Sequence, residues 1–226
     1  MTREPQATAE AASRRRRPPW GWVVVGLVVA AAVVAVMVRT HVAAVTLQGA
    51  VLTPPAPAPD FALLDQDRRP VRLSALRGKS VALTFLYTHC PDVCPLIATK
   101  MHETYLQLGG TAKRIQFVAV SVDPRGDTPS AIRGFLATHQ VEGELLYLTG
   151  PLADLRSVWA NYFVGSDAKA VNPQAVSAGP VSPDVVNHTA IVYLIDPRGM
   201  LRVFLPGNFD PKDLAADLRI LSADAK

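Results

Sequence analysis

The 226-residue chain contains very little cysteine, with only Cys90 and Cys94, which have three residues between them. A disulfide-stapled scaffold uses several dispersed cysteines, so that class of fold is excluded. A purely structural disulfide between these two residues would close a very short loop and remove little entropy from the unfolded chain. The close pair therefore indicates chemistry: a redox dithiol, a metal site, or both.

The sequence also lacks an excess of charge outside its N-terminal part. The formal net charge is +4, but residues 1–59 hold six Lys/Arg against two acidic residues, which leaves 17 of each sign for residues 60–226. A nucleic-acid-binding domain carries a basic patch or stripe. We therefore expect no nucleic-acid partner, and we interpret the basic cluster Arg14–Arg17 as a membrane topology signal.

One long stretch, Trp20–Val38, has no charged side chain at all. At ~1.5 Å per helical residue it would span roughly 28 Å, close to the thickness of the hydrocarbon core of a bilayer. Arginines before such a run place the N-terminus in the cytoplasm. The sequence predicts a basic cytoplasmic segment 1–19 and a transmembrane anchor 20–38. The rest of the chain would lie on the periplasmic side of a bacterial-type cytoplasmic membrane. A cleaved signal peptide is the alternative.

Residues 39–59 are rich in Ala, Val and Pro, a composition that favours an extended tether over a packed segment. The folded domain is predicted to occupy residues 60–226. Apolar runs in that region predict strands at 81–87, 115–122, 145–148, 189–195 and 200–205. Helical patterns separate the first four strands, whereas a DPRG turn joins the last two in an antiparallel hairpin. This order predicts an α/β domain with a mixed central sheet.

The two cysteines follow a buried strand and precede a helix. In open α/β sheets, ligands collect where strands end in this way. Pro95 suits the first helical position, so we expect Cys94 to cap this helix. The unpaired N–H groups and the positive end of the helix dipole would then lower the pKa of the Cys94 thiol. The two sulfurs are suited to closing a disulfide or to binding one soft metal ion.

Two thiolates make an incomplete metal site, and the chain has five histidines from which a third ligand could come. His188 directly precedes the strand 189–195. If this strand lies antiparallel beside the strand 81–87, its start meets the end that carries the cysteines, and His188 lies against them. His89 is the weaker candidate, because adjacent residues diverge at the end of a strand. The remaining histidines are explained as tether or helix residues: His41, His102 and His139.

Three further residues have two interpretations each. Met101 is either a thioether ligand or, because it lies on an apolar helix, a core residue, which we favour. Asp123 and Asp127 follow the second strand and could face the site. Turn formation and helix capping, however, already explain both acids, which stand in the Asp-Pro and Asp-Thr-Pro sequences.

Three segments carry a resemblance to a known family: FLYTHCPDVCP at 85–95, SVDPRGDTP at 121–129 and NHTAIVYLIDPRG at 187–199. From residue 60 onward the chain resembles the Sco (SenC) family of copper-binding assembly factors. The resemblance implies a thioredoxin-like fold and copper, as Cu(I) or Cu(II), bound by Cys90, Cys94 and His188. It also implies a role in building the copper A centre of cytochrome c oxidase subunit II. The family often has an acidic residue where this chain has Asn187.

Two functions follow from this site. The leading interpretation is a copper metallochaperone, since thiolates suit Cu(I) and imidazole suits both oxidation states. The alternative is a thiol–disulfide oxidoreductase that keeps the cysteines of the copper A site reduced, and one cysteine pair can support both. Other periplasmic copper carriers or thiol reductants are further expected partners. A peroxidase ranks third, because only the general likeness of the fold to peroxiredoxins supports it.

Overall fold

The computed structural model describes residues 20–41, 46–164 and 190–223. The chain divides into two compact units, residues 1–45 and residues 46–226. In the first unit, helix α1 covers Trp20–His41 and includes the predicted span 20–38. Among the residues that the structure describes, no helix is long and apolar enough to cross a membrane. The predicted anchor therefore stays a prediction.

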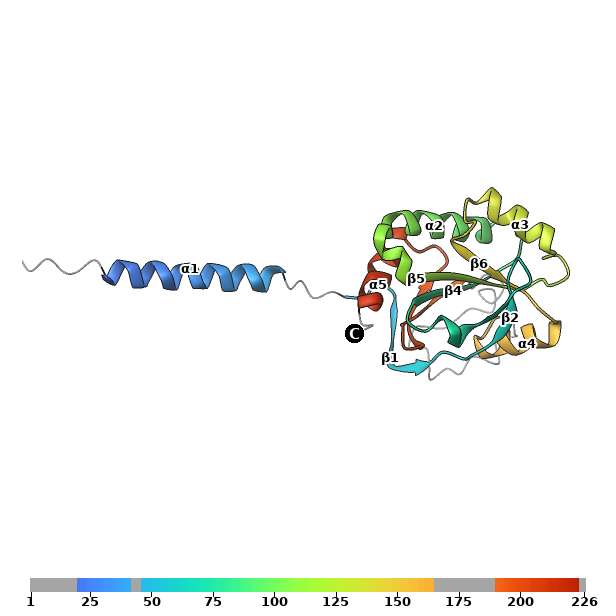
Figure 1. The fold of residues 1–226 in the computed structure, drawn as a ribbon, viewed down its shortest axis with the longest axis horizontal. Helices are drawn as coiled ribbons and strands as arrows, with labels where there is room; N and C mark the ends of the chain where they lie inside the picture. Colours follow the sequence, from blue (N-terminus) through green and yellow to red (C-terminus); the bar gives the residue numbers. More distant parts are fainter. Residues whose placement is uncertain (1–19, 42–45, 165–189, 224–226) are drawn as a thin grey trace, which may run out of the picture. The chain divides into compact units, whose positions relative to one another are not determined.

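The second unit is built around a six-stranded sheet with the strand order β1-β8-β7-β4-β5-β6 (Figure 1). The strands are β1 (Ala50–Pro57), β4 (Ser80–Leu86), β5 (Ile115–Ser121), β6 (Leu145–Leu148), β7 (Ile191–Ile195) and β8 (Met200–Pro206). Strands β4, β5 and β6 are parallel, whereas β7 is antiparallel to β4, and β8 is antiparallel to both β7 and β1. The predicted mixed α/β domain with a mixed central sheet is thereby confirmed.

Helices cover both faces of this sheet. The helices are α2 (Val93–Leu108), α3 (Pro129–Thr138), α4 (Leu152–Asn161) and α5 (Pro211–Ala223), with short 3₁₀ turns at Leu73–Leu76 and Gly109–Arg114. One hydrophobic cluster joins the sheet to α2, α3 and α5, and a second joins the other face to α4. A hairpin of β2 (Ala62–Leu64) and β3 (Pro70–Arg72) also packs on the α4 side.

Strand β4 shows why the apolar run in the sequence forms a central strand. Ala82 and Leu86 point into the cluster under α2, whereas Val81 and Leu83 point into the cluster under α4. Side chains alternate between the two faces of a strand, so a strand covered on both faces must be apolar throughout. The position of β4 at the centre of the sheet therefore follows from its composition.

The prediction of a tether at residues 39–59 is wrong for its second half, because residues 50–57 form strand β1. Residues 50–57 pair with β8 at the edge of the sheet, and the compact unit begins at Thr46. The pairing register shifts between Val51 and Ala56, on either side of Pro54 and Pro55. Proline has no N–H to donate and is tolerated at edge strands and bulges. The composition indicated an extended backbone correctly, but it did not reveal that this backbone pairs.

Candidate metal and thiol site

The two cysteines lie where β4 leads into α2, as the sequence predicts. Both are free thiols, and their residues are only 8% (Cys90) and 3% (Cys94) exposed. The backbone N–H of Cys90 donates to the carbonyl of Tyr87 at 3.3 Å, which closes a tight turn after the strand. The backbone N–H of Cys94 donates to the Cys90 sulfur at 3.4 Å. This last contact brings the Cys90 sulfur to the first turn of α2.

The start of α2 differs from the prediction. The helix begins at Val93, and Asp92 occupies the N-cap position without a side-chain capping hydrogen bond. Cys94 is therefore a residue of the first helical turn rather than its cap. Because the free N–H groups of a first turn point back along the chain, they are available to the sulfur of Cys90. The N–H groups at the start of α2 thus act on Cys90 and not, as predicted, on Cys94.

The two thiols differ in acidity. Burial opposes the thiolate at Cys90, but a hydrogen bond from the Asp92 N–H counters it. Cys90 also accepts hydrogen bonds from the thiol and the N–H of Cys94 and from the Tyr87 hydroxyl. The net effect of these hydrogen bonds is a lowered pKa of Cys90. At Cys94, burial dominates and raises the pKa to about 12. The prediction that Cys94 is the activated thiol is wrong, and Cys90 carries the more stable thiolate.

Tyr87 is a residue of this site that the sequence analysis missed. Its hydroxyl is hydrogen-bonded to the Cys90 thiol, and this contact is the main cause that raises the pKa of Tyr87. Its backbone N–H reaches the Cys94 sulfur. Tyr87 thus contacts both sulfurs. The signal available in the sequence is a polar aromatic residue at the end of a buried strand, three positions before the first cysteine.

Two of the acids that follow β5 have distinct local roles. Asp123 accepts a hydrogen bond from the Gly126 N–H at 3.1 Å and so closes a turn. Asp127, which is only 2% exposed, points into the protein instead. The cap of α3 is Thr128, whose hydroxyl accepts from the Ala131 N–H at 3.2 Å. Asp127 therefore does not cap α3, and the capping residue is the next one, Thr128.

The strand arrangement behind the His188 prediction is confirmed. Strand β7 runs antiparallel to β4 with Val81 opposite Ile195, so β7 begins at the end of β4 that leads to Cys90. Ala190 lies just before β7 and packs against the same cluster as both cysteines. His188 itself is outside the described residues. Within the described part of the chain, no group of three or more His, Cys, Asp and Glu residues could hold a metal ion.

The other candidate ligands have structural partners. Met101 is 1% exposed and belongs to the core, which confirms the favoured interpretation. The Nδ1 atom of His89 lies 3.0 Å from the Thr88 hydroxyl. His102 bonds Glu144, with 3.0 Å between Nδ1 and Oε2. The ring of His139 lies against Phe135, and His41 is the last residue of α1.

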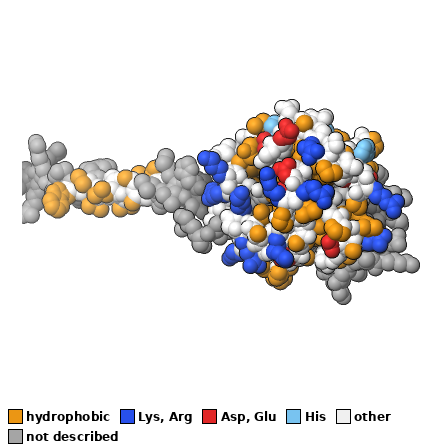
Figure 2. Space-filling model, turned by 45° about the vertical axis from the view of Figure 1, so that its right-hand side comes forward, with side chains coloured by type: hydrophobic (Ala, Val, Ile, Leu, Met, Phe, Trp, Pro, Cys, Tyr) orange, Lys and Arg blue, Asp and Glu red, His pale blue; other side chains and the backbone are white. Residues whose placement is uncertain are grey.

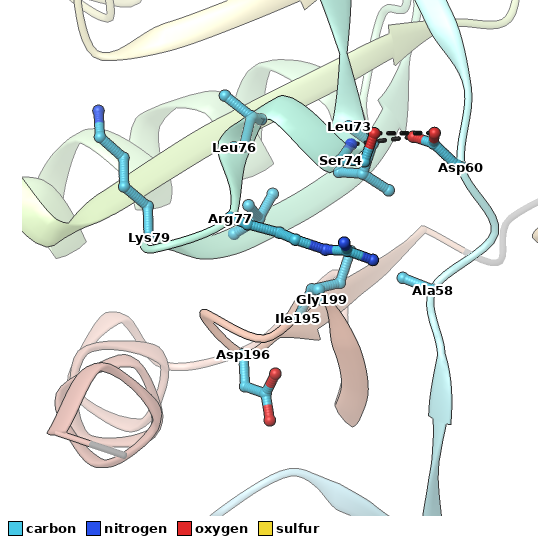
Figure 3. Close-up of a pocket in the computed structure, with 11 residues that line it drawn as sticks. Ala58, Asp60, Leu73, Ser74, Leu76, Arg77, Lys79, Ile195, Asp196 and Gly199 are labelled. Atoms are coloured by element: carbon cyan, nitrogen blue, oxygen red, sulfur yellow. Dashed lines mark hydrogen bonds between the residues drawn. The ribbon is translucent and has the colours of Figure 1, made fainter. Parts of the chain in front are cut away.

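A pocket lies beside the start of β4, at the opposite end of that strand from the cysteines. Figure 3 shows the residues that line it. Its walls include Arg77, Ser74 and Asp196, and the Ser74 hydroxyl is tied to Asp60 at 2.9 Å. Neither cysteine lines it, so this pocket is not part of the thiol site. On the face shown in Figure 2, Lys and Arg side chains are scattered among apolar and acidic ones rather than joined in one stripe.

The mixed sheet and the buried dithiol at a strand–helix junction define a thioredoxin-like domain. The model of the SCO1/SenC family matches residues 51–223. The chain therefore belongs to the SCO1/SenC family.

Relatives and solved structures agree with this assignment. The bovine protein SCO2 homolog, mitochondrial, is 34% identical over 62% of this chain and 50% of its own length. A protein of Stutzerimonas stutzeri is 30% identical over 64% of this chain and 66% of its own length. The matched region thus spans about half to two thirds of these relatives.

Two solved structures, each 30% identical to this chain, cover about three quarters of it. The Bradyrhizobium japonicum ScoI structure with copper bound has a TM-score of 0.59 and covers 74% of this chain and 99% of its own. The apo Sco1 protein from Thermus thermophilus has a TM-score of 0.63 and covers 79% of this chain and 99% of its own.

Proposed function

We propose that this protein is a copper metallochaperone that binds copper through Cys90, Cys94 and His188. It would pass the metal to the copper A centre of cytochrome c oxidase subunit II. The observation that carries the proposal is the buried pair of free thiols, held side by side at the end of β4. Two such sulfurs form a soft donor set, which suits Cu(I). The likeness to a ScoI structure that contains copper supports the same metal.

The path of the chain before β7 supports His188 as the third ligand. A Cβ added at Gly207 would lie 2.6 Å from the Ala190 Cβ and 3.1 Å from the Ile97 Cδ1, so Ala190 and Ile97 sit close together. Ile97 is one turn beyond Cys94 on α2. Because a residue spans at most about 3.6 Å of extended chain, His188 can lie no further than roughly 7 Å along the backbone from Ala190. We propose that its imidazole reaches the sulfurs from there, where it would suit both Cu(I) and Cu(II).

A second function, thiol–disulfide exchange, is favoured by the unequal acidity of the two thiols. Cys90 has a lowered pKa, whereas burial raises that of Cys94 to about 12. A thiolate is the attacking form in disulfide exchange, so Cys90 would attack and Cys94 would resolve the mixed disulfide. The protein would then keep the copper A cysteines reduced, with a thiol reductant as its own electron source.

We further propose that the protein acts at the outer face of a cytoplasmic membrane. The uncharged run within α1 and the preceding Arg14–Arg17 support a single-pass anchor with residues 46–226 on the periplasmic side. A tethered domain would remain close to a membrane-bound oxidase, which raises its effective concentration there.

Metal analysis of the reduced full chain tests the leading proposal. The wild-type protein should bind about one copper, and His188→Ala should lose the thiolate-to-copper charge-transfer band of the Cu(II) form. The binding of Cu(I) would be weakened rather than lost, because two sulfurs can still hold this ion. His139→Ala is the matched control, since that ring packs on Phe135.

Two further results decide between the functions. Transfer to a soluble copper A fragment, followed by the absorption of that centre, should proceed for the wild type and the control but fail for His188→Ala. If His188→Ala transfers copper as the wild type does, the three-ligand proposal is wrong. If reduced wild-type protein binds no copper but reduces a disulfide of the fragment, the oxidoreductase becomes the function.

A further inference from the structure

Asp127 is a buried carboxylate that three hydrogen bonds tie to three separate segments. Its Oδ1 accepts from the backbone N–H of Thr88 at 2.7 Å. Its Oδ2 accepts from the Ser121 hydroxyl at 2.6 Å and from the Tyr147 hydroxyl at 2.9 Å. Thr88 belongs to the segment between β4 and α2, Ser121 ends β5, and Tyr147 lies in β6. One side chain thus joins the cysteine segment to two strands of the sheet.

Local structure does not explain this orientation of Asp127. The turn before α3 is closed by Asp123, and the helix is capped by Thr128. Burying a carboxylate is unfavourable unless donors compensate for the lost water, and Asp127 has three such donors. A neutral residue would avoid that cost altogether. The arrangement is therefore best explained by what the carboxylate does for the segment that it contacts.

The contact with Thr88 lies two residues before Cys90. The turn that follows is closed by the Cys90 N–H on Tyr87, so Thr88 is inside the turn that presents the Cys90 sulfur. The charge of Asp127 also acts on the second cysteine, where, after burial and the neighbouring Cys90, it helps to raise the pKa of Cys94. Asp127 therefore acts on the turn that holds Cys90 and on the thiol of Cys94.

We propose that Asp127 is the positioning residue of the cysteine site, because its carboxylate holds the Thr88 backbone against β5 and β6. This fixes the turn after β4, so that the Cys90 sulfur stays at the first turn of α2 beside Cys94. The proposal rests on the proposed function, in which these two sulfurs bind the metal. The fixed negative charge also favours a bound cation over bare thiolates and favours the disulfide over the reduced pair.

Three variants of the full chain separate these effects. Asp127→Ala removes the acceptors for all three donors. Asp127→Asn keeps the size of the side chain and one acceptor oxygen for Thr88 but removes the charge. Ser121→Ala is the matched control, since it deletes one donor to the same carboxylate and leaves both the charge and the Thr88 contact in place.

Two measurements are made on each folded variant. Cu(I) affinity is measured by competition with a chromophoric chelator, where we expect Asp127→Ala to bind at least tenfold more weakly than the wild type. The equilibrium between disulfide plus two glutathione thiols and dithiol plus glutathione disulfide is measured without copper. Asp127→Asn should shift it at least fivefold toward the dithiol. Ser121→Ala should melt at a lower temperature yet stay within twofold of the wild type in both assays.

The copper-free assay keeps this inference separate from the proposed function. If the wild type binds no copper, the metallochaperone proposal fails, and the shift in the glutathione equilibrium still supports or overturns the role of Asp127. If Asp127→Ala does not fold, Asp127→Asn carries the test. Wild-type copper affinity for Asp127→Ala overturns the positioning role, and wild-type values for Asp127→Asn in the glutathione assay overturn the role of the charge. Equal shifts in Ser121→Ala and Asp127→Asn also overturn it, because they would indicate a loss of stability alone.

Discussion

Gly207→Ala should both destabilise the fold and disturb the site, because Gly207 lies where β7 enters the sheet. The added methyl would lie 2.6 Å from the Ala190 Cβ, 3.0 Å from the Ala190 carbonyl oxygen and 3.1 Å from the Ile97 Cδ1. Two of these atoms belong to Ala190, so relief of the clash requires the start of β7 and Gly207 to move apart. Overpacking of this kind costs about 1–3 kcal/mol. We expect a loss of that size in the free energy of unfolding.

The control for this prediction is Gly134→Ala in α3. A Cβ at Gly134 meets no atom within 4 Å, and the residue lies inside a helix. Replacing a helical glycine with alanine in open space should stabilise the protein by about 0.5–1 kcal/mol. Urea unfolding of both variants measures the two opposite changes. If Gly207→Ala is as stable as the wild type, Ala190 does not pack against Gly207.

The same variant carries a functional prediction. A displaced Ala190 would also displace the chain that leads to His188, so Gly207→Ala should bind Cu(II) more weakly than the wild type, whereas Gly134→Ala should bind it normally. Competition with a copper chelator at a temperature where both variants are folded measures this. If Gly207→Ala is destabilised but binds copper normally, the start of β7 does not affect the metal site. That result would contradict His188 as a ligand.

Three other predictions concern the thiols and the membrane. Cys90 should be alkylated first at pH 7, because its lowered pKa keeps more thiolate there, whereas Cys94, with a pKa of about 12, should react only in strongly alkaline solution. Mass spectrometry of briefly alkylated protein identifies the modified residue, and labelling of Cys94 first would refute the assigned acidity. Copper and a Cys90–Cys94 disulfide should exclude each other, since both use the same sulfurs, so air-oxidised protein should take up essentially no copper without reductant. Equal uptake by both forms would argue against a site at these cysteines. Protease added to intact spheroplasts should remove residues 46–226, and protection until lysis would reverse the proposed topology.

Local patterns in the sequence determined most of the fold. The uninterrupted apolar run at 81–87 indicated a strand covered on both faces, and β4 has that position. The DPRG turn indicated a hairpin because Asp196 can satisfy the turn by itself. Its carboxylate accepts from the N–H groups of Arg198 and Met200, each at 3.0 Å. Such features involve residues close in the chain, so the sequence shows them directly.

The cysteine pair, too, was evident from its spacing and from the strand that precedes it. Its chemistry was not, because the acidity of each thiol depends on burial and on which donors reach it. The sequence pointed to the residue next to the helix start, yet the donors of that helix reach Cys90. An expectation drawn from neighbours along the chain therefore assigned the thiolate to the wrong cysteine.

The features that only the tertiary structure decided join residues far apart in the chain. Strand β1 has the composition of a tether, and its place in the sheet depends on a partner about 150 residues later. Asp127 has the sequence context of a helix cap, and its contact with Thr88 spans 39 positions. Neither contact leaves a local pattern, because what stabilises it is the burial and hydrogen bonding that arise when distant segments pack together. The sequence alone thus determined most of the elements and the reactive pair, whereas packing decided which cysteine is acidic and what holds it in place.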